Sequence, residues 1–224
     1  MSQPLASLRS NFQYFTKQRQ AILFLAVMYL AGIIGIYGNI HPEFVLLTPI
    51  NLLASLLIAL YFHGKWTARL TQFLILSYAL GFLAELFGVQ TGILFGDYSY
   101  GKVLGPKVWG TPFMIGINWM LLSYTVGMLV NEIGGRWRWP LRAVMGAALM
   151  VLLDLFIEPV AIEYGFWAWD GDSVPLRNYL GWFVVALPIQ AFFAYHFKGQ
   201  KNKVAAWLFV FQFAFFVILG ALAF

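Results

Sequence analysis

Seven long stretches of apolar, almost uncharged residues constrain this chain more than any other feature. Such stretches suit helices that cross a bilayer, because each crossing needs about 20 mostly apolar residues. A membrane β-barrel would instead show segments of about ten residues with alternating polarity. Only 10% of the 224 residues are charged and 61% are hydrophobic, so little sequence remains for a soluble domain. We therefore predict an all-α, polytopic membrane protein in which residues 1–224 form a single integral membrane domain.

The predicted spans are named by their first and last apolar residues. They are Ala21–Tyr37, Phe44–Phe62, Leu70–Phe87, Trp109–Val130, Leu141–Ile162, Tyr179–Phe197 and Val204–Phe224. Eleven of the fourteen Lys and Arg residues fall in residues 1–19 or in the connections that follow the second, fourth and sixth spans. Positive charge concentrates on the cytoplasmic side of membrane proteins. We predict a protein of the cell membrane with residues 1–19 in the cytoplasm and the C-terminus outside.

Several classes of function lack the residues that they need. The chain has no Cys, so thiolate metal sites and cysteine nucleophiles are excluded. Neither the GxxxxGK[ST] nor the GxGxxG phosphate-binding pattern occurs. The last span has no Lys for a retinal Schiff base, and His41, His63 and His196 are too isolated for a di-iron site. We expect no cofactor, no metal and no nucleic-acid partner.

Three acidic residues lie inside predicted spans. Glu85 is in the third span, and Asp154 and Glu158 are in the fifth. Both spans run outward, which places the three side chains in the outer half of the membrane. Asp154 and Glu158 are four residues apart and so share one helix face, and Pro159 weakens the helix beside them. Acids at membrane depth are costly and usually functional, although a hydrogen-bonded pair that locks two spans together is the structural alternative.

The two longest outer connections are alike in sequence. Glu85 and Glu158, which are 73 residues apart, are each followed after six residues by a glycine and then by a pair of aromatic residues one residue apart. These pairs are Tyr98 with Tyr100, and Trp167 with Trp169. This pattern predicts an internal repeat in which spans three and four match spans five and six. Chance similarity in a chain rich in Phe, Gly and Leu is the competing explanation.

The same residues resemble the carotenoid biosynthesis hydratase family, which includes bacterial γ-carotene 1′,2′-hydratases and archaeal bisanhydrobacterioruberin hydratases. The likeness covers roughly residues 75–190. Its motifs are Glu85-x-x-Gly88-Val-x-Thr-Gly92, Phe95-Gly96-x-Tyr98-x-Tyr100, Asp154-x-x-x-Glu158-Pro159-x-Ala161, Gly165-x-Trp167-x-Trp169 and Pro175-x-x-Asn178-x-x-Gly181-Trp182.

The resemblance implies addition of water to the terminal C1′=C2′ double bond of an acyclic carotenoid end group, of γ-carotene or lycopene type. A neutral carboxyl group would protonate the alkene, and water would capture the tertiary cation. The candidate roles are proton donor for Asp154 or Glu158; water-side partner for Glu85 and Asp97; cation lining for Tyr98, Tyr100, Trp167 and Trp169; and orientation of water or a carboxyl group for Asn118 and Asn178. Trp182 is a further candidate for binding the substrate. The carotenoid substrate, membrane lipid and other carotenoid-pathway enzymes are the expected partners.

Two other functions stay open on sequence alone. A membrane lycopene cyclase also protonates a polyene with a buried carboxyl group, but the cation closes a ring instead of capturing water. A proton-coupled transporter of small or lipophilic solutes uses acids at membrane depth and helix-breaking prolines. The acids of this chain gather towards one side of the membrane, which disfavours a transport path across it.

Overall fold

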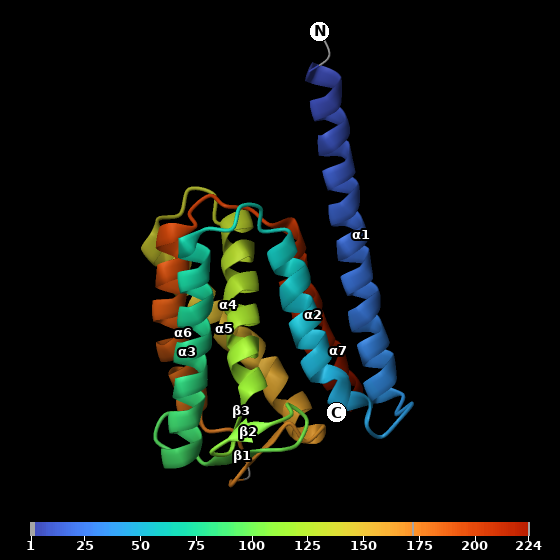
Figure 1. The fold of residues 1–224 in the computed structure, drawn as a ribbon. Coiled ribbons are helices and arrows are strands. Elements are labelled where there is room, and N and C mark those ends of the chain that lie inside the picture. Colours follow the sequence, from blue (N-terminus) through green and yellow to red (C-terminus); the bar gives the residue numbers. More distant parts are fainter. Residues whose placement is uncertain (1–2, 172, 224) are drawn as a thin grey trace.

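A bundle of seven apolar helices forms the molecule, and a small layer of strands closes one end of it (Figure 1). The computed structural model describes residues 3–171 and 173–223. Its helices are α1 Gln3–Tyr37, the short 3-10 helix η1 Phe44–Leu47, α2 Thr48–Tyr61, α3 Ala68–Thr91, α4 Phe113–Ile133, α5 Trp139–Glu163, α6 Leu176–His196 and α7 Lys203–Ala223. All seven segments predicted to span the membrane correspond to helices long and apolar enough to do so.

The main differences from the predicted spans lie at their ends. The first helix begins at Gln3 and not near Ala21, because no Gly or Pro interrupts the sequence between Pro4 and Gly32. The second span is divided, since Pro49 lacks an N–H group and starts a new helix after η1. Phe224, the predicted end of the last span, lies outside the described residues.

The fourth helix begins at Phe113, four residues later than predicted. Trp109 lies in the turn between strands β2 (Lys107–Val108) and β3 (Thr111–Pro112), which pair antiparallel. Trp109 has a positive φ of 46° and its side chain is 74% exposed. The first residues of the predicted span therefore belong to a hairpin that precedes the helix. A count of hydrophobic residues does not distinguish the two structures.

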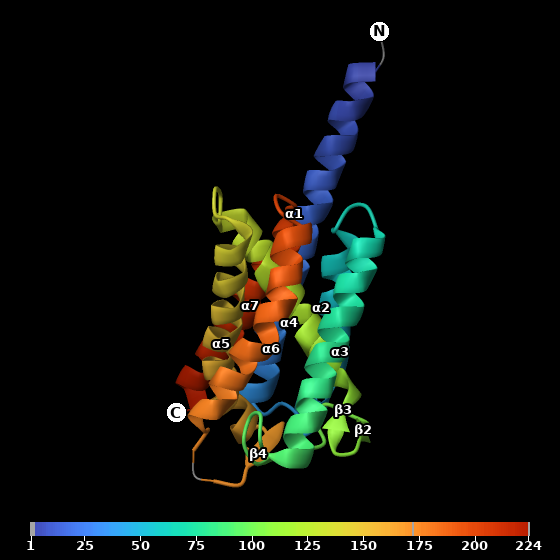
Figure 2. The same ribbon diagram turned by 90° about the vertical axis from the view of Figure 1, so that its left-hand side faces the viewer.

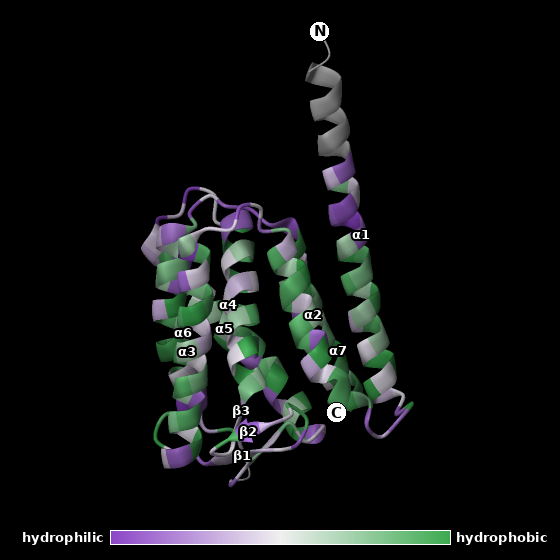
Figure 3. Cartoon of the chain, in the orientation of Figure 1, coloured by the Kyte–Doolittle hydropathy of each residue, from purple (hydrophilic) through white to green (hydrophobic). Residues whose placement is uncertain are grey.

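Helix α4 forms the centre of the bundle. In its most apolar stretch 67% of the residues are buried, compared with 17% in that of α1. Helix α4 packs against α2, α3, α5, α6 and α7. Helix α6 lies between α3 and α5, which brings the helices with the membrane acids to a common neighbour (Figure 2). The flanks of the helices are hydrophobic, and hydrophilic residues gather at the two ends of the bundle (Figure 3).

The end of the bundle that lies away from the N-terminus is covered by two paired strands (Figure 1). β1 (Tyr98–Tyr100) pairs antiparallel with β4 (Trp167–Trp169), with Tyr98 opposite Trp169 and Tyr100 opposite Trp167. The two backbone segments approach closely beside this pair, where a Cβ atom on Gly101 would lie 2.0 Å from the Gly165 carbonyl oxygen. The two similar connections noted in the sequence therefore join in a single sheet.

Candidate active site

Three acidic side chains are buried beneath the β1–β4 sheet. Glu85 on α3 is 3% exposed, and Asp154 and Glu158 on α5 are 0% and 2% exposed. The ion pairs found among the described residues are Arg177 with Asp97 and Lys201 with Glu132, so none of the three acids has a basic partner there. Buried carboxyl groups without a counter-charge depend on hydrogen bonds for their stability.

Glu85 accepts three hydrogen bonds from aromatic side chains. The hydroxyl groups of Tyr98 and Tyr100 donate to Oε2 at 2.5 and 2.7 Å, and Trp119 Nε1 donates to Oε1 at 3.0 Å. Trp119 reaches this position by packing over Gly81, where a Cβ atom would lie 2.2 Å from its ring. Burial, and after it the neighbouring Glu85 carboxylate, raises the pKa of both tyrosines, so both keep their protons as donors.

Glu158 also accepts three hydrogen bonds, but from indole and amide groups. Trp167 Nε1 and Trp169 Nε1 both donate to Oε2 at 2.9 Å, and Asn178 Nδ2 donates to Oε1 at 3.1 Å. The same Asn178 amide donates to Asp154 Oδ2 at 2.9 Å and so links the two acids. The second oxygen of Asp154, Oδ1, is buried and has no hydrogen-bond partner among the described residues.

The alternation of the two strands brings their four aromatic rings to one face. Residues i and i+2 of a strand point the same way, so both members of each aromatic pair face the acids while Ser99 and Ala168 are exposed. The Tyr98 and Trp169 ring centroids are 5.0 Å apart, and those of Tyr100 and Trp167 are 5.9 Å apart. Each strand donates to the acid that precedes it in the chain, and strand pairing unites the two halves.

A small pocket lies among these groups. It has a volume of about 10 Å³, about the space that one water molecule needs. Its lining residues are Glu85, Tyr98, Tyr100, Ile115, Glu158, Trp167, Trp169, Asn178 and Trp182. Asp154 is not among them, although the Asn178 amide links it to Glu158. Glu85 and Glu158 are therefore the two acids that face a common space.

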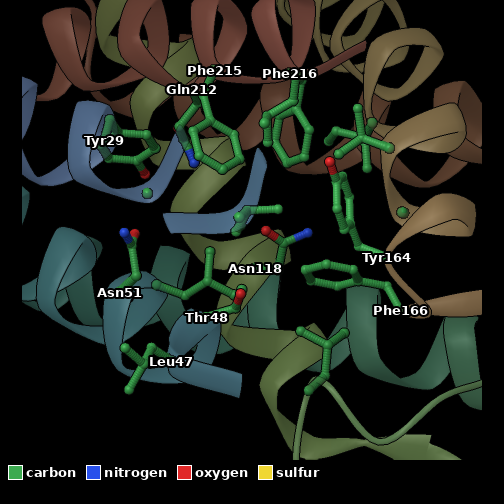
Figure 4. Close-up of a pocket in the computed structure, with 18 of the residues that line it drawn as sticks. Tyr29, Leu47, Thr48, Asn51, Asn118, Tyr164, Phe166, Gln212, Phe215 and Phe216 are labelled. Carbon is green, nitrogen blue, oxygen red and sulfur yellow. The ribbon is translucent and has the colours of Figure 1, made fainter. Parts of the chain in front are cut away.

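A second, larger cavity, shown in Figure 4, shares two lining residues with the small pocket. Its volume is about 330 Å³, within the range of ligand-binding pockets. Residues of α1, η1, α2, α4, α5 and α7 line it, together with Leu104, Tyr164, Phe166 and Trp167, and the lining is largely apolar. Ile115 and Trp167 line both spaces and form the boundary between them. The arrangement joins an apolar chamber to a polar pocket of carboxyl and aromatic groups.

Two of the predicted site residues lie outside the carboxylate cluster. The Asp97 side chain is 63% exposed and forms an ion pair with Arg177 at 3.0 Å. Asp97 directly precedes β1, so strand alternation points it away from the face of Tyr98. Asn118 faces the larger cavity and makes no side-chain hydrogen bond with the described residues (Figure 4). Trp182, by contrast, lines the small pocket and stacks on Trp119 with 4.3 Å between centroids.

Trp119 is the residue of the cluster that the sequence prediction omitted. A signal for it was present, because Trp119 follows Pro112 by seven residues and Trp182 follows Pro175 by seven. Pro112 and Pro175 are the N-caps of α4 and α6, so the two tryptophans occupy the same turn of their helices and meet by stacking. Within the described part of the chain, no group of three His, Asp or Glu side chains is placed to hold a metal ion.

The family model described as carotenoid biosynthesis protein matches residues 45–224. The chain belongs to the carotenoid biosynthesis protein family. Bisanhydrobacterioruberin hydratase of Haloarcula japonica is 34% identical over 104 residues. That alignment covers 44% of this chain and 36% of the length of the relative. No solved structure matches the chain. Family membership therefore identifies the chain as a carotenoid biosynthesis protein.

Proposed function

We propose that this protein is a carotenoid hydratase, which adds water across the terminal C1′=C2′ bond of an acyclic end group of γ-carotene or lycopene type. The observation that best supports the proposal is the junction of the two spaces at Ile115 and Trp167. The larger cavity suits an apolar chain, and the small pocket suits one water molecule between two carboxyl groups. Family membership and the hydratase relative point to the same chemistry.

The proton donor is assigned to the Asp154–Glu158 pair. Two carboxyl groups linked by one amide in an apolar interior repel each other when both are ionised, so the pair retains a proton. Glu158 faces the small pocket and delivers the proton, while Asp154 lies behind Asn178 and shares the charge. The alkene π electrons form the new C–H bond at C2′, which leaves the cation at C1′.

Glu85 is assigned to the water. It faces the same pocket from the opposite helix, and two phenol groups and one indole stabilise its carboxylate form. A water molecule held beside Glu85 forms the C–O bond at C1′ and loses a proton to a carboxylate. Proton exchange between the carboxyl groups restores the starting state, so the reaction adds one water and consumes nothing else.

The aromatic rings around the pocket stabilise the cation. Trp167, Trp169 and Trp182 contribute indole faces, and Tyr98 and Tyr100 contribute phenol rings. A cation near the face of an aromatic ring gains about 0.5–2 kcal/mol, with the larger values in desolvated sites. The amide of Asn118, which lines the cavity and has no hydrogen-bond partner among the described residues, is available to orient the substrate end group or the alcohol product.

The orientation and the repeat complete the proposal. The positively charged connections lie at the end of the bundle near the N-terminus, so we assign that end to the cytoplasm and the acids to the outer half of the membrane.

We also infer that α3-β1-α4 and α5-β4-α6 are repeated units, each supplying one aromatic strand and one of the two acids that line the small pocket. The antiparallel β1–β4 pairing and the Trp119–Trp182 stack are consistent with a two-fold relation between them.

Expression in bacteria that accumulate lycopene or γ-carotene tests the proposal. Mass spectrometry of the pigments should show a new, more polar product that is heavier by one water. A product of unchanged mass would indicate ring closure, which is the reaction of a lycopene cyclase. Unaltered pigments of both types would contradict the proposed activity on these substrates.

A further inference from the structure

The larger cavity reaches the lateral surface of the helix bundle, which faces lipid. Leu47 and Ile50, which line it, are 51% and 67% exposed. Both belong to the segment of η1 and α2 that follows α1, and in a membrane these exposed apolar side chains face lipid. The same cavity ends at Ile115 and Trp167 beside the carboxylate pocket. The cavity therefore extends from the lipid-facing surface to the two residues that border the carboxylate pocket.

The packing of α1 explains why the space stays unfilled. α1 packs along α7 and against η1, and these contacts exceed those with α2 (Figure 1). Gly35 lies against the Phe44 ring, where a Cβ atom would be 2.2 Å away, and Gly32 lies against Phe215. These close contacts fix α1 at η1 and along α7. Side chains of α1 and α2 form facing walls, including Met28 on α1 and Ala54 on α2.

The chemistry of the walls suits a long hydrocarbon. No charged side chain is among the described residues that line the cavity. Two of the polar side chains on the wall are already engaged: the Tyr29 hydroxyl contacts Ser55 Oγ at 3.4 Å, and Ser55 donates to Asn51 at 3.3 Å. An apolar ligand there would leave few polar groups unpaired, which keeps the desolvation cost low.

We propose that the space between α1 and α2 is a lateral opening through which a long polyene enters from the bilayer. The reactive end of the polyene lies at Ile115 and Trp167, and the rest of its chain extends between the two helices into lipid. This inference rests on the proposed function for the identity of the reaction. It adds a route of entry and a selection rule, because a linear end group fits through a gap between helices more readily than a bulky cyclic one.

The absence of native Cys permits a direct test in the intact protein. Ala54→Cys places a single thiol on the α2 wall, and Ile75→Cys places one on the exposed, lipid-facing surface of α3, which does not line the cavity. Each variant is reconstituted in liposomes and treated with either a methyl-sized thiol reagent or a bulky apolar maleimide. Polyene binding is followed by quenching of tryptophan fluorescence, and hydration by product mass.

The bulky label on Ala54→Cys should reduce polyene binding and hydration at least tenfold, while the methyl-sized label has a much smaller effect. Bound polyene should slow labelling of Ala54→Cys and leave labelling of Ile75→Cys unchanged. Thermal unfolding before and after labelling identifies any loss of fold. Equal binding before and after bulky labelling of folded Ala54→Cys would overturn the lateral opening. If the bulky label blocks polyene binding but the unlabelled protein forms no hydrated product, the lateral opening is supported. The same result contradicts the proposed hydratase activity.

Discussion

Two buried polar clusters, at opposite ends of the helix bundle, use their hydrogen bonds differently. At the end near the N-terminus, side chains donate mainly to backbone carbonyl groups. Asn131 donates to the carbonyl oxygens of Phe197 and Gln200, and Arg142 donates to those of Trp137 and Gly135. The last carbonyl groups of a helix lack partners within it. These bonds satisfy such groups and the connections beside them, so stability explains this cluster.

At the other end, the hydrogen bonds of the three acids connect side chains only. Phenol, indole and amide groups donate to Glu85, Asp154 and Glu158, and none of these bonds satisfies a backbone group. One acid oxygen, Asp154 Oδ1, has no partner among the described residues. A bundle that needed only stability would be served as well by apolar residues of similar volume. We therefore attribute a structural role to the first cluster and propose a catalytic role for the second.

Replacing the proposed proton donor should separate the two clusters most clearly. Glu158→Gln keeps the size of the side chain but cannot deliver a proton, so the hydration rate should fall about 10²–10⁴-fold. Glu163→Gln, at the exposed end of the same helix, is the matched control and should retain the parent rate. Product formation by Glu158→Gln at the parent rate would remove Glu158 from the mechanism.

Substitution in the cluster of Asn131 and Arg142 should lower the stability of the protein and leave its hydration rate unchanged. Arg142→Gln leaves Asn131 Oδ1 and buried carbonyl groups without their donor, and the free energy of unfolding should fall by about 1–3 kcal/mol. The control Arg136→Gln removes the same charge from an exposed loop position. Denaturant titration measures the stability, and the rate per folded molecule should match the parent. A reduced rate in folded Arg142→Gln would break the proposed division.

A single donor to the acid should have a moderate effect. Trp169→Phe keeps an aromatic ring in β4 but removes one of three N–H groups that hold Glu158. A lost hydrogen bond of about 0.5–1.5 kcal/mol corresponds to a rate reduced about 2–10-fold. Trp109→Phe, in the exposed β2–β3 turn, provides the comparison. Steady-state rates of the two variants should therefore differ, and equal rates would show that the indole N–H group does not matter.

The smallest effect is expected at the acid that lies outside the cluster. The Asp97–Arg177 pair is exposed on both sides, and such surface pairs contribute about 0–1 kcal/mol to stability. Asp97→Asn should therefore leave the hydration rate and the unfolding temperature near the parent values. A large loss of rate would return Asp97 to the role of water-side partner.

The sequence predicted the spans because each is a long, mostly apolar run, and the structure confirms seven helices long and apolar enough to cross a membrane. It predicted their ends less well where local backbone preferences decide, as at Pro49 and at the hairpin before Phe113. The sequence predicted a common depth for Glu85, Asp154 and Glu158, and all three are buried beneath the β1–β4 sheet. The larger cavity was not predicted, because its walls combine residues from six separated segments whose sequences resemble any other apolar helix.

Isotope labelling of the reaction tests most directly whether this protein adds water to a polyene. The purified protein would convert its polyene in heavy-oxygen water and, separately, in deuterium oxide. A hydratase should yield an alcohol that contains one heavy oxygen atom in the first case and one new carbon-bound deuterium in the second. A product of unchanged oxygen content that nevertheless gains carbon-bound deuterium would show that the acids protonate the polyene but that water does not capture the cation. That result would contradict the assignment of this protein as a hydratase.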